Sequence, residues 1–407
     1  MRRVVDALMR RFIMFGRLDI LYSDGQRVTY QGRGAEPAAA MHLMTPRAER
    51  AMVINSGLAF GESYMDGEIA PLDCSLEELL SVLMLNINRT GHIVNRLEGA
   101  TRYATRKWAQ FNTLAGSRRN VAHHYDLNGR LYDLFLDPDR QYSCAYYARD
   151  DMTLEEAQVA KKHHIGAKLN LDRPGLRVLD IGCGWGGMAL TLARDYGAQV
   201  TGITLSKEQF EVARARAREA GLADRITIEL RDYRDVRHQY DRIVSVGMFE
   251  HVGVGQFDRF FRAVRECLLP DGVALLHSIG RMDGPGSTNP WLDKYIFPGG
   301  YSPALSETIA AIERADLWVT DCEILRLHYA KTIAEWRHRF EARRDEVVEM
   351  YDARFYRMFD LYLVGAELSF RVQGHMNFQL QLTRSQTAVP LTRDYMVDRE
   401  RAAPAQG

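Results

Sequence analysis

The sequence predicts an α/β protein in which helices cover both faces of a mostly parallel sheet, preceded by a smaller N-terminal α+β domain. From about residue 121 to 385, short apolar strands alternate with helices, which is typical of a parallel sheet. The first strand of this region ends at Asp180–Ile181, a glycine-rich turn follows at residues 182–187, and a helix begins directly after it. A strand, a glycine turn and a helix in this order are typical of nucleotide-binding parallel sheets.

The strands of this sheet are predicted from apolar runs bounded by glycine or polar residues. The clearest helix spans Glu208–Ala220, because Ser206 can cap its start and Gly221 can end it. The expected strands are Arg177–Ile181, Gln199–Thr204, Ile226–Leu230, Tyr240–Val246, Gly272–Ile279 and Trp318–Leu327.

Residues 1 to about 80 combine helical and strand patterns. An amphipathic helix comes first, and two alternating runs, Leu18–Tyr22 and Arg27–Tyr30, are joined by a Ser-Asp-Gly turn, which predicts a hairpin. A helix resumes at Ser75, with Glu78 completing a capping box. We therefore expect an N-terminal domain with a basic linker at residues 1–115, a second domain at 116–390 and a flexible, irregular tail at 391–407.

The overall composition argues against several classes of protein. The 407 residues include 53 Lys and Arg and 53 Asp and Glu, so the formal net charge is zero and no nucleic-acid partner is indicated. Charges interrupt every apolar stretch well before the ~20 residues of a membrane span, and the N-terminus lacks the features of a secretory signal. The five cysteines are scattered and form no CxxC pair, which argues against a disulfide framework and for a reducing compartment.

Local charge is less even than the total. Residues 1–17 carry five arginines and one acid, and residues 101–119 carry five basic residues and no acid, with apolar or aromatic residues interleaved in both. Such segments fit contact with an anionic membrane surface, but each alone also fits a solvated helix face.

The residues at the strand tips indicate which class of ligand binds at the glycine turn. A carboxylate at Asp180 would repel a pyrophosphate, but it suits a ligand that carries an ammonium and a sulfonium centre. A dinucleotide-binding fold would also place an acid at the second strand tip, whereas this chain has Thr204, with Gln209 as a neutral partner for a ribose. Asp232 and Tyr233 follow the third strand, where an adenine would meet a carboxylate at N6 and a stacking ring. These residues favour S-adenosylmethionine over NAD.

Other polar residues are less specific. Glu250 follows the fourth strand, and His277 lies in an apolar strand that approaches the same sheet edge. Cys144 lies in a polar-aromatic loop with no evident base, which favours packing or a small-anion contact over a nucleophile. The clusters at 123–126 and 161–164 contain paired histidines, but neighbours on a helix point to different faces and no HxxxH or HxH spacing occurs. We expect no metal site.

Six segments carry a further signal through their order and spacing. They are HHYDLNGRLYDLFLDPDRQYSCAYYARDDMTLEEAQ, VLDIGCGWGGMALTLA, GITLSKEQ, DRIVSVGMFEHVG, LLPDGVALLHSIG and WLDKYIFPGGYSP. Together they resemble the cyclopropane-fatty-acyl-phospholipid synthase family, which includes the mycolic-acid cyclopropane synthases and related fatty-acid methyltransferases. The resemblance covers about residues 120–385, and the N-terminal region is similar to the extra domain of the phospholipid-acting members.

The resemblance implies a class I S-adenosylmethionine-dependent methyltransferase with a Rossmann-like, seven-stranded, mostly parallel sheet. It implies methyl transfer to a cis double bond of an unsaturated phospholipid acyl chain. The resulting carbocation closes a cyclopropane when the new methyl group loses a proton, with a bound bicarbonate ion as the base. We expect the N-terminal domain to present lipid or to form a homodimer, and the protein to be cytoplasmic and peripherally associated with the inner face of the cytoplasmic membrane.

The family's site residues carry over onto matching positions of this chain. Glu250 would orient the bicarbonate ion or tune its basicity by hydrogen bonding. Tyr233 occupies the position at which the mycolic-acid enzymes commonly have a tryptophan. The implied bicarbonate ligands are Cys144, Glu250, His277, Ile279 and Tyr329. The implied cofactor contacts are Tyr142, Ser143, Gly182, Gly184, Thr204, Gln209 and Tyr233, to which the strand-tip reasoning adds Asp180, Gly186 and Asp232.

One position departs from the family pattern. Many members carry a cysteine four residues before a Phe-Arg pair in a late helix, and this chain has Ala366 there. This substitution could change how the acyl chain fits in the site and therefore the product. The same carbocation can lose a different proton and give a methyl-branched, methylene or methyl-alkene chain. Two other functions stay open from the sequence: a lipid-binding regulatory protein without turnover, and a soluble small-molecule methyltransferase.

Overall fold

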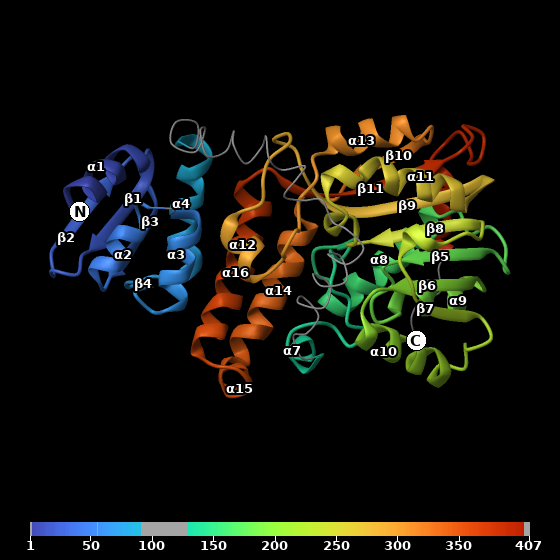
Figure 1. The fold of residues 1–407 in the computed structure, drawn as a ribbon, viewed down its shortest axis with the longest axis horizontal. Coiled ribbons are helices and arrows are strands. Elements are labelled where there is room, and N and C mark those ends of the chain that lie inside the picture. Colours follow the sequence, from blue (N-terminus) through green and yellow to red (C-terminus); the bar gives the residue numbers. More distant parts are fainter. Residues whose placement is uncertain (1, 55, 91–128, 403–407) are drawn as a thin grey trace. The chain divides into compact units, whose positions relative to one another are not determined.

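A computed structural model describes residues 2–54, 56–90 and 129–402, which form two compact units (Figure 1). Among the described residues, the N-terminal unit combines the chain up to residue 90 with residues 286–298 and 333–375. The sheet unit combines residues 129–285, 299–332 and 376–402. The basic segment at 101–119 and the cluster at 123–126 lie outside the described residues.

The N-terminal unit contains a four-stranded sheet in the order β2-β1-β3-β4. The predicted hairpin is confirmed, because β1 and β2 pair antiparallel with Leu18 opposite Tyr30. Strand β3 pairs parallel with the other edge of β1. The Ser75–Glu78 capping box is also present at the start of α4. The elements are α1 (Arg2–Phe12), β1 (Phe15–Leu21), β2 (Arg27–Gln31), β3 (Arg33–Leu43), α2 (Pro46–Ala51), α3 (Ser56–Met65), β4 (Ile69–Pro71), α4 (Leu76–Thr90), α12 (Pro290–Tyr295), α15 (Arg344–Met350) and α16 (Ala353–Val372).

The sheet unit is built on a seven-stranded sheet in the order β10-β11-β9-β8-β5-β6-β7 within the described part of the chain. Neighbours from β9 through β7 pair in parallel, whereas β10 and β11 pair antiparallel. The predicted fold class is confirmed. The strands are β5 (Arg177–Ile181), β6 (Gln199–Thr204), β7 (Ile226–Leu230), β8 (Tyr240–Val246), β9 (Leu268–Arg281), β10 (Trp318–Ile324) and β11 (His375–Thr383).

Helices cover both faces of this sheet (Figure 1). Side chains from α8, α9 and α10 join Val178 in one apolar core, and side chains from α11 and α13 join Leu179 in the other, because adjacent residues of a strand point to opposite faces. The helices and 3₁₀ turns are α7 (Gly129–Asp133), α8 (Leu154–Lys168), α9 (Gly187–Tyr196), α10 (Lys207–Glu219), η1 (Tyr233–Asp235), η2 (Phe249–His251), η3 (Val254–Gln256), α11 (Phe257–Cys267), α13 (Leu305–Arg314) and α17 (Asp394–Ala402). Helix α14 (His328–Ala342) begins in this unit, and its residues 333–342 belong to the N-terminal unit.

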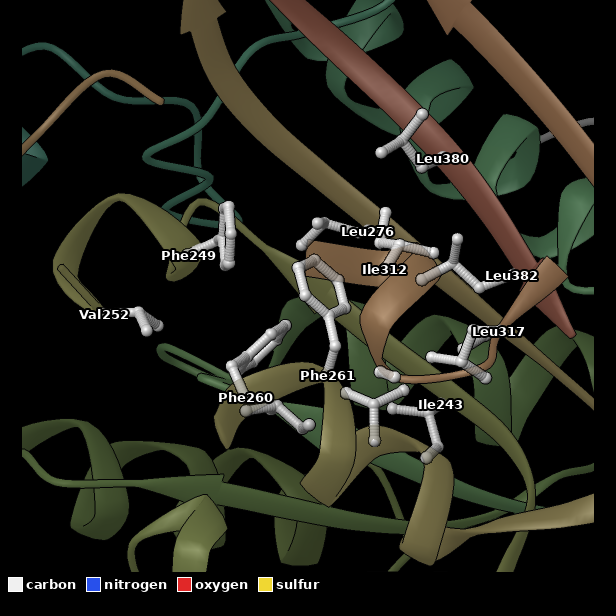
Figure 2. Packing of buried hydrophobic residues seen from close by; sticks show 14 of the residues in the cluster. Ile243, Phe249, Val252, Phe260, Phe261, Leu276, Ile312, Leu317, Leu380 and Leu382 are labelled. Atoms are coloured by element: carbon white, nitrogen blue, oxygen red, sulfur yellow. The ribbon is translucent and has the colours of Figure 1, made fainter. Parts of the chain in front are cut away.

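Figure 2 shows the second of these cores, in which Phe249, Phe260 and Phe261 lie close to Leu276 of β9. Phe249 and Phe261 are fully buried, and burying one such side chain contributes about 1.5–3 kcal/mol. This packing fixes the segment that follows β8, which carries Glu250. Among the described residues, no helix is both long and apolar enough to cross a membrane.

Two elements at the C-terminal end were not expected. Strand β11 alternates apolar and amide side chains, and its polar face is also buried, so the strand lacks a solvent-facing side that would have made the pattern easy to recognise. Residues 394–402, expected to be irregular, form helix α17. Polar contacts hold this helix in place: Glu400 bonds with His164 of α8, and Arg399 donates to the carbonyl of Leu171, which follows α8. Met396 is the one residue of the helix that is buried, so no apolar stripe marks it.

Candidate active site

The glycine turn after β5 has a backbone conformation that requires glycine. Gly182, Gly184 and Gly186 have φ values of 82°, 54° and 87°, in the left-handed region that other residues rarely adopt. A Cβ atom on Gly182 would also lie 2.8 Å from the Cβ of Met248. Gly186 is the N-cap of α9, so the turn brings backbone directly to a helix N-terminus. At Gly184 no atom lies within 4 Å of the position that a Cβ would take, so a ligand can approach the main chain closely there.

Asp180 lies beside this turn, near the carboxyl end of β5. Its side chain is buried, with a relative exposure of 2% for the residue, and its Oδ2 atom has no hydrogen-bond partner among the described residues. Burial raises the pKa of this carboxyl group to about 7. A cationic group of a ligand would stabilise its ionised form.

The end of β6 supplies a second polar pair. The Thr204 hydroxyl donates to Oε1 of Gln209 at 2.8 Å and accepts the Ser206 amide at 3.1 Å. Ser206 caps α10, as expected, by accepting the amide of Gln209. The structure thus brings Thr204 and Gln209 together, and both are buried.

The adenine-side residues lie after β7. Both carboxylate oxygens of Asp232 accept hydrogen bonds from the Arg234 guanidinium, at 2.8 and 2.7 Å. This ion pair was not expected from the sequence, and contact of Asp232 with an adenine stays a prediction. The Tyr233 ring packs edge to face with Phe260, with 5.3 Å between the ring centroids.

Glu250 and Ile279 meet at the ends of β8 and β9. The Oε1 atom of Glu250 accepts the Ile279 amide at 2.6 Å, while its Oε2 atom is buried with no partner in the described ranges. Burial raises the pKa of Glu250 to about 7. His277 lies two residues earlier on β9, and burial lowers its pKa to about 3, so it is neutral at physiological pH. This cluster pairs a readily protonated carboxyl group with a neutral imidazole.

The loop that carries Cys144 is fixed to the start of α14. The Ala145 amide donates to Oγ1 of Thr332 at 3.1 Å, and the Tyr147 amide donates to Nδ1 of His328 at 2.9 Å. Tyr329 lies in the first turn of this helix and is buried. Burial raises the pKa of the Cys144 thiol, which stays protonated at neutral pH. The thiol is therefore unsuited to nucleophilic attack.

The remaining predicted cofactor contacts precede Cys144. Ser143 is buried and its hydroxyl accepts a hydrogen bond from Lys161 at 2.8 Å. The Tyr142 ring contacts the rings of Tyr132 and Phe135, with centroid separations of 5.3 and 6.2 Å.

His277 has two amide partners on β11 that were not predicted from the sequence. The amide nitrogen of Gln379 on β11 lies 3.1 Å from Nδ1 of His277, and Gln379 is fully buried. The amide nitrogen of Asn377, also on β11, lies 3.5 Å from Nε2 of the same ring, so two buried amides hold the neutral imidazole from both sides. The alternation of buried amides with apolar residues along β11 was the signal that could have revealed them.

We expect Gln379→Leu to lower turnover about 10-fold, because the lost hydrogen bond no longer holds the His277 ring in position. Gln381→Leu is the matched control, since Gln381 is equally buried on the same face of β11 but bonds to the Lys168 carbonyl and Tyr395 instead. Steady-state kinetics and the ¹⁵N chemical shifts of His277 measure the two effects. Equal losses of turnover in both variants would contradict this role for Gln379.

Comparison with known proteins decides the family. Residues 113–380 match the family described as mycolic acid cyclopropane synthetase, and residues 6–92 match a domain of unknown function. The chain belongs to the mycolic acid cyclopropane synthetase family. It is an S-adenosylmethionine-dependent methyltransferase of the cyclopropane synthase type that modifies lipids.

Some relatives of this synthetase-family enzyme match it over most of both sequences. The cyclopropane-fatty-acyl-phospholipid synthase of Escherichia coli is 38% identical over 86% of this chain and 89% of its own length. The tuberculostearic acid methyltransferase of Mycobacterium tuberculosis is 36% identical over 94% of this chain and 91% of its own. A crystal structure of a mycolic acid cyclopropane synthase complexed with SAH and CTAB is 34% identical, with a TM-score of 0.62, over 65% of this chain and 97% of that chain.

Proposed function

We propose that the protein is a cyclopropane-fatty-acyl-phospholipid synthase. It would transfer the methyl carbon of S-adenosylmethionine to a cis double bond of a membrane phospholipid acyl chain and close the ring with bicarbonate as the base. The observation that carries this proposal is the pair of buried carboxyl groups, Asp180 and Glu250, near the carboxyl ends of the adjacent strands β5 and β8. Each has one oxygen with no partner in the described chain, and each has a pKa raised to about 7.

The residues around the glycine turn fit S-adenosylmethionine. Asp180 offers a carboxylate to a cationic group, the turn offers open backbone, and Thr204 with Gln209 offers polar atoms to a ribose. Bound S-adenosylmethionine supplies an electrophilic methyl group. The chain's own contribution is to hold that group in place and to keep water away from it.

The residues around Glu250 fit a small oxygen anion such as bicarbonate. A protonated Glu250 can donate a hydrogen bond from Oε2, and the single N–H of the neutral His277 imidazole offers a second donor. Tyr329 would offer a phenolic hydroxyl. An anion in such a buried place needs donors of this kind, because an uncompensated buried charge is costly.

The proposed reaction conserves charge and electron pairs at each step. The alkene π electrons form a bond to the methyl carbon while the carbon–sulfur bond breaks, and the sulfur keeps that electron pair. The acyl chain then carries a positive charge on the neighbouring carbon. Loss of a proton from the new methyl group to the base leaves the electron pair that closes the cyclopropane ring.

Helix α1 supports contact with a membrane surface. Its Val5 and Met9 are buried, whereas Arg3, Val4 and Arg11 are exposed. Cations beside exposed apolar side chains favour an anionic lipid surface, at about 1 kcal/mol per basic residue near it. Vesicle sedimentation should therefore show binding that rises with anionic lipid and weakens with salt. Binding that ignores both would refute this part of the proposal.

The decisive experiment is product analysis. We expect unsaturated phospholipid vesicles incubated with the protein and methyl-labelled S-adenosylmethionine to yield acyl chains with cyclopropane ring protons in NMR spectra and the label in mass spectra. Label in a branched or methylene chain without a ring would overturn the ring-forming proposal. It would instead support a fatty-acid C-methyltransferase, the second candidate function, which Ala366 and the similarity to a tuberculostearic acid methyltransferase favour. Cofactor binding without turnover of any lipid would indicate a regulatory protein.

A further inference from the structure

Helix α8 carries three buried lysines whose surroundings differ. Lys162 forms an ion pair with Asp139 at 2.5 Å, and Lys168 forms one with Glu323. Lys161 is fully buried, but its Nζ atom contacts only neutral groups, Oε1 of Gln141 at 2.5 Å and Oγ of Ser143 at 2.8 Å. No carboxylate lies within ion-pair distance of Lys161 in the described part of the chain.

Nearby acids are already engaged with other groups. Asp139 pairs with Lys162 and Arg216, and the carboxylate of Asp137 accepts the backbone amides of Asp139 and Gln141. A buried ammonium group without a counter-ion is unfavourable, and buried charges in proteins are usually paired. Asp137 and Asp139 therefore act on the charge of Lys161 only from a distance, and no carboxylate of the described chain contacts its ammonium group directly.

The position of Lys161 indicates where that anion would come from. Lys161 contacts the hydroxyl of Ser143, a predicted cofactor contact. It also interacts electrostatically with Cys144, Asp180 and His277, which belong to the two predicted ligand sites. The ammonium group thus faces the region where both ligands of the proposed reaction would bind.

We propose that Lys161 binds the carboxylate-type anion of this site and acts as its counter-ion. The anion has two sources, the carboxylate of the methionine part of the cofactor and a bicarbonate ion. The inference rests on the proposed function for the location of both ligands. Lys161 would act by binding charge, since its ammonium group has no carboxylate beside it in the described chain that could neutralise it.

The test compares Lys161→Met with Lys161→Arg, which keeps the charge, and with Lys162→Met as the neighbouring control. Isothermal titration with S-adenosylhomocysteine and with 5′-methylthioadenosine, which lacks the amino-acid part, measures whether Lys161 binds the carboxylate of the cofactor. Titration with ¹³C-bicarbonate followed by NMR measures whether it binds bicarbonate. Lys161→Gln is measured alongside, because it keeps hydrogen bonding if methionine fails to support the loop.

If the cofactor's carboxylate is the partner, Lys161→Met and Lys161→Gln should bind S-adenosylhomocysteine about 10- to 100-fold more weakly and 5′-methylthioadenosine unchanged. If bicarbonate is the partner, both variants should lose bicarbonate affinity by a similar factor and keep that for S-adenosylhomocysteine. Lys161→Arg should retain most of either affinity. Unchanged affinities for all three probes, or equal losses for the two nucleosides, would overturn the proposal. Because these readouts are binding constants, they stand apart from the product analysis, which alone decides between ring closure and simple methylation.

Discussion

Replacing Glu250 by glutamine is expected to lower turnover by about 10²- to 10⁴-fold, the range in which a positioned acid or base contributes to catalysis. Glutamine keeps the shape of the side chain, and its Oε1 atom can still accept the Ile279 amide. It can no longer exchange a proton at Oε2, the atom that has no partner within the described chain. Proton transfer at the proposed bicarbonate site should therefore be lost, while the local fold is kept.

The same substitution should stabilise the folded protein at neutral and alkaline pH. Burial raises the pKa of Glu250 from an ordinary value of 4.5 to about 7, so between these values the folded state holds a proton that the unfolded state has released. The contribution of Glu250 to stability therefore falls as pH rises through this window and stays low above it. Glutamine cannot ionise, so the stability difference in favour of the variant should grow from about pH 4.5 to 7.

Thermal unfolding across pH 4–9, together with kinetics and titration of S-adenosylhomocysteine, checks this expectation. Glu266→Gln is the control, because Glu266 is exposed on α11. Cofactor affinity should be nearly unchanged in both variants. Full turnover in Glu250→Gln would remove this residue from the chemistry, and a pH-independent stability difference would contradict the buried, ionisable carboxyl group.

The sequence was most informative where local rules determine structure. Strand β5, the glycine turn and the Ser206 cap were predictable because each depends on residues close in sequence: apolar runs, positive φ values and a hydroxyl that meets a helix start. The same local pattern located Asp180. Glu250 could be placed at a strand tip in the same way, and the resemblance of its segment to a known family added a role.

Residues that act through distant partners could not be predicted in this way. Gln379 meets His277 across about a hundred residues, and the ion pair of Asp232 depends on how the η1 turn folds back on it. Helix α17 was missed because hydrogen bonds such as that of Glu400 with His164 hold it in place rather than an apolar stripe. Lys161 could be seen in the sequence as part of a basic and histidine-rich cluster. Only the structure shows that it is buried without a carboxylate in contact, which indicates that it binds an anion.

Asp180→Asn is expected to weaken binding of S-adenosylmethionine by about 100-fold or more and to make the ligand-free protein more stable above pH 7. Leaving one member of a buried charge pair without its partner costs about 3–5 kcal/mol, which sets the scale of the affinity loss. Asparagine keeps the shape and one oxygen acceptor but offers no charge to a cationic ligand. Activity and stability should thus move in opposite directions.

The pH dependence of binding gives a sharper test than the affinity alone. Burial raises the pKa of Asp180 from 3.8 to about 7, so the unfolded chain loses its proton first and stability falls as pH rises between these values. A bound cation favours the ionised carboxylate and lowers its pKa, so S-adenosylmethionine should bind more tightly as pH rises through about 7 and displace a proton below that pH. In Asp180→Asn this pH dependence should disappear.

Calorimetric titration at pH 6, 7 and 8, in two buffers of different ionisation enthalpy, measures both the affinity and the number of protons released. Asp224→Asn serves as the control, because Asp224 is exposed at the turn before β7 and should behave as the unmodified protein. A flat pH profile in the unmodified protein would show that Asp180 is ionised before the cofactor arrives. In that case the charge of Lys161, which interacts with Asp180 from beyond ion-pair distance, would already favour the ionised carboxylate in the ligand-free protein.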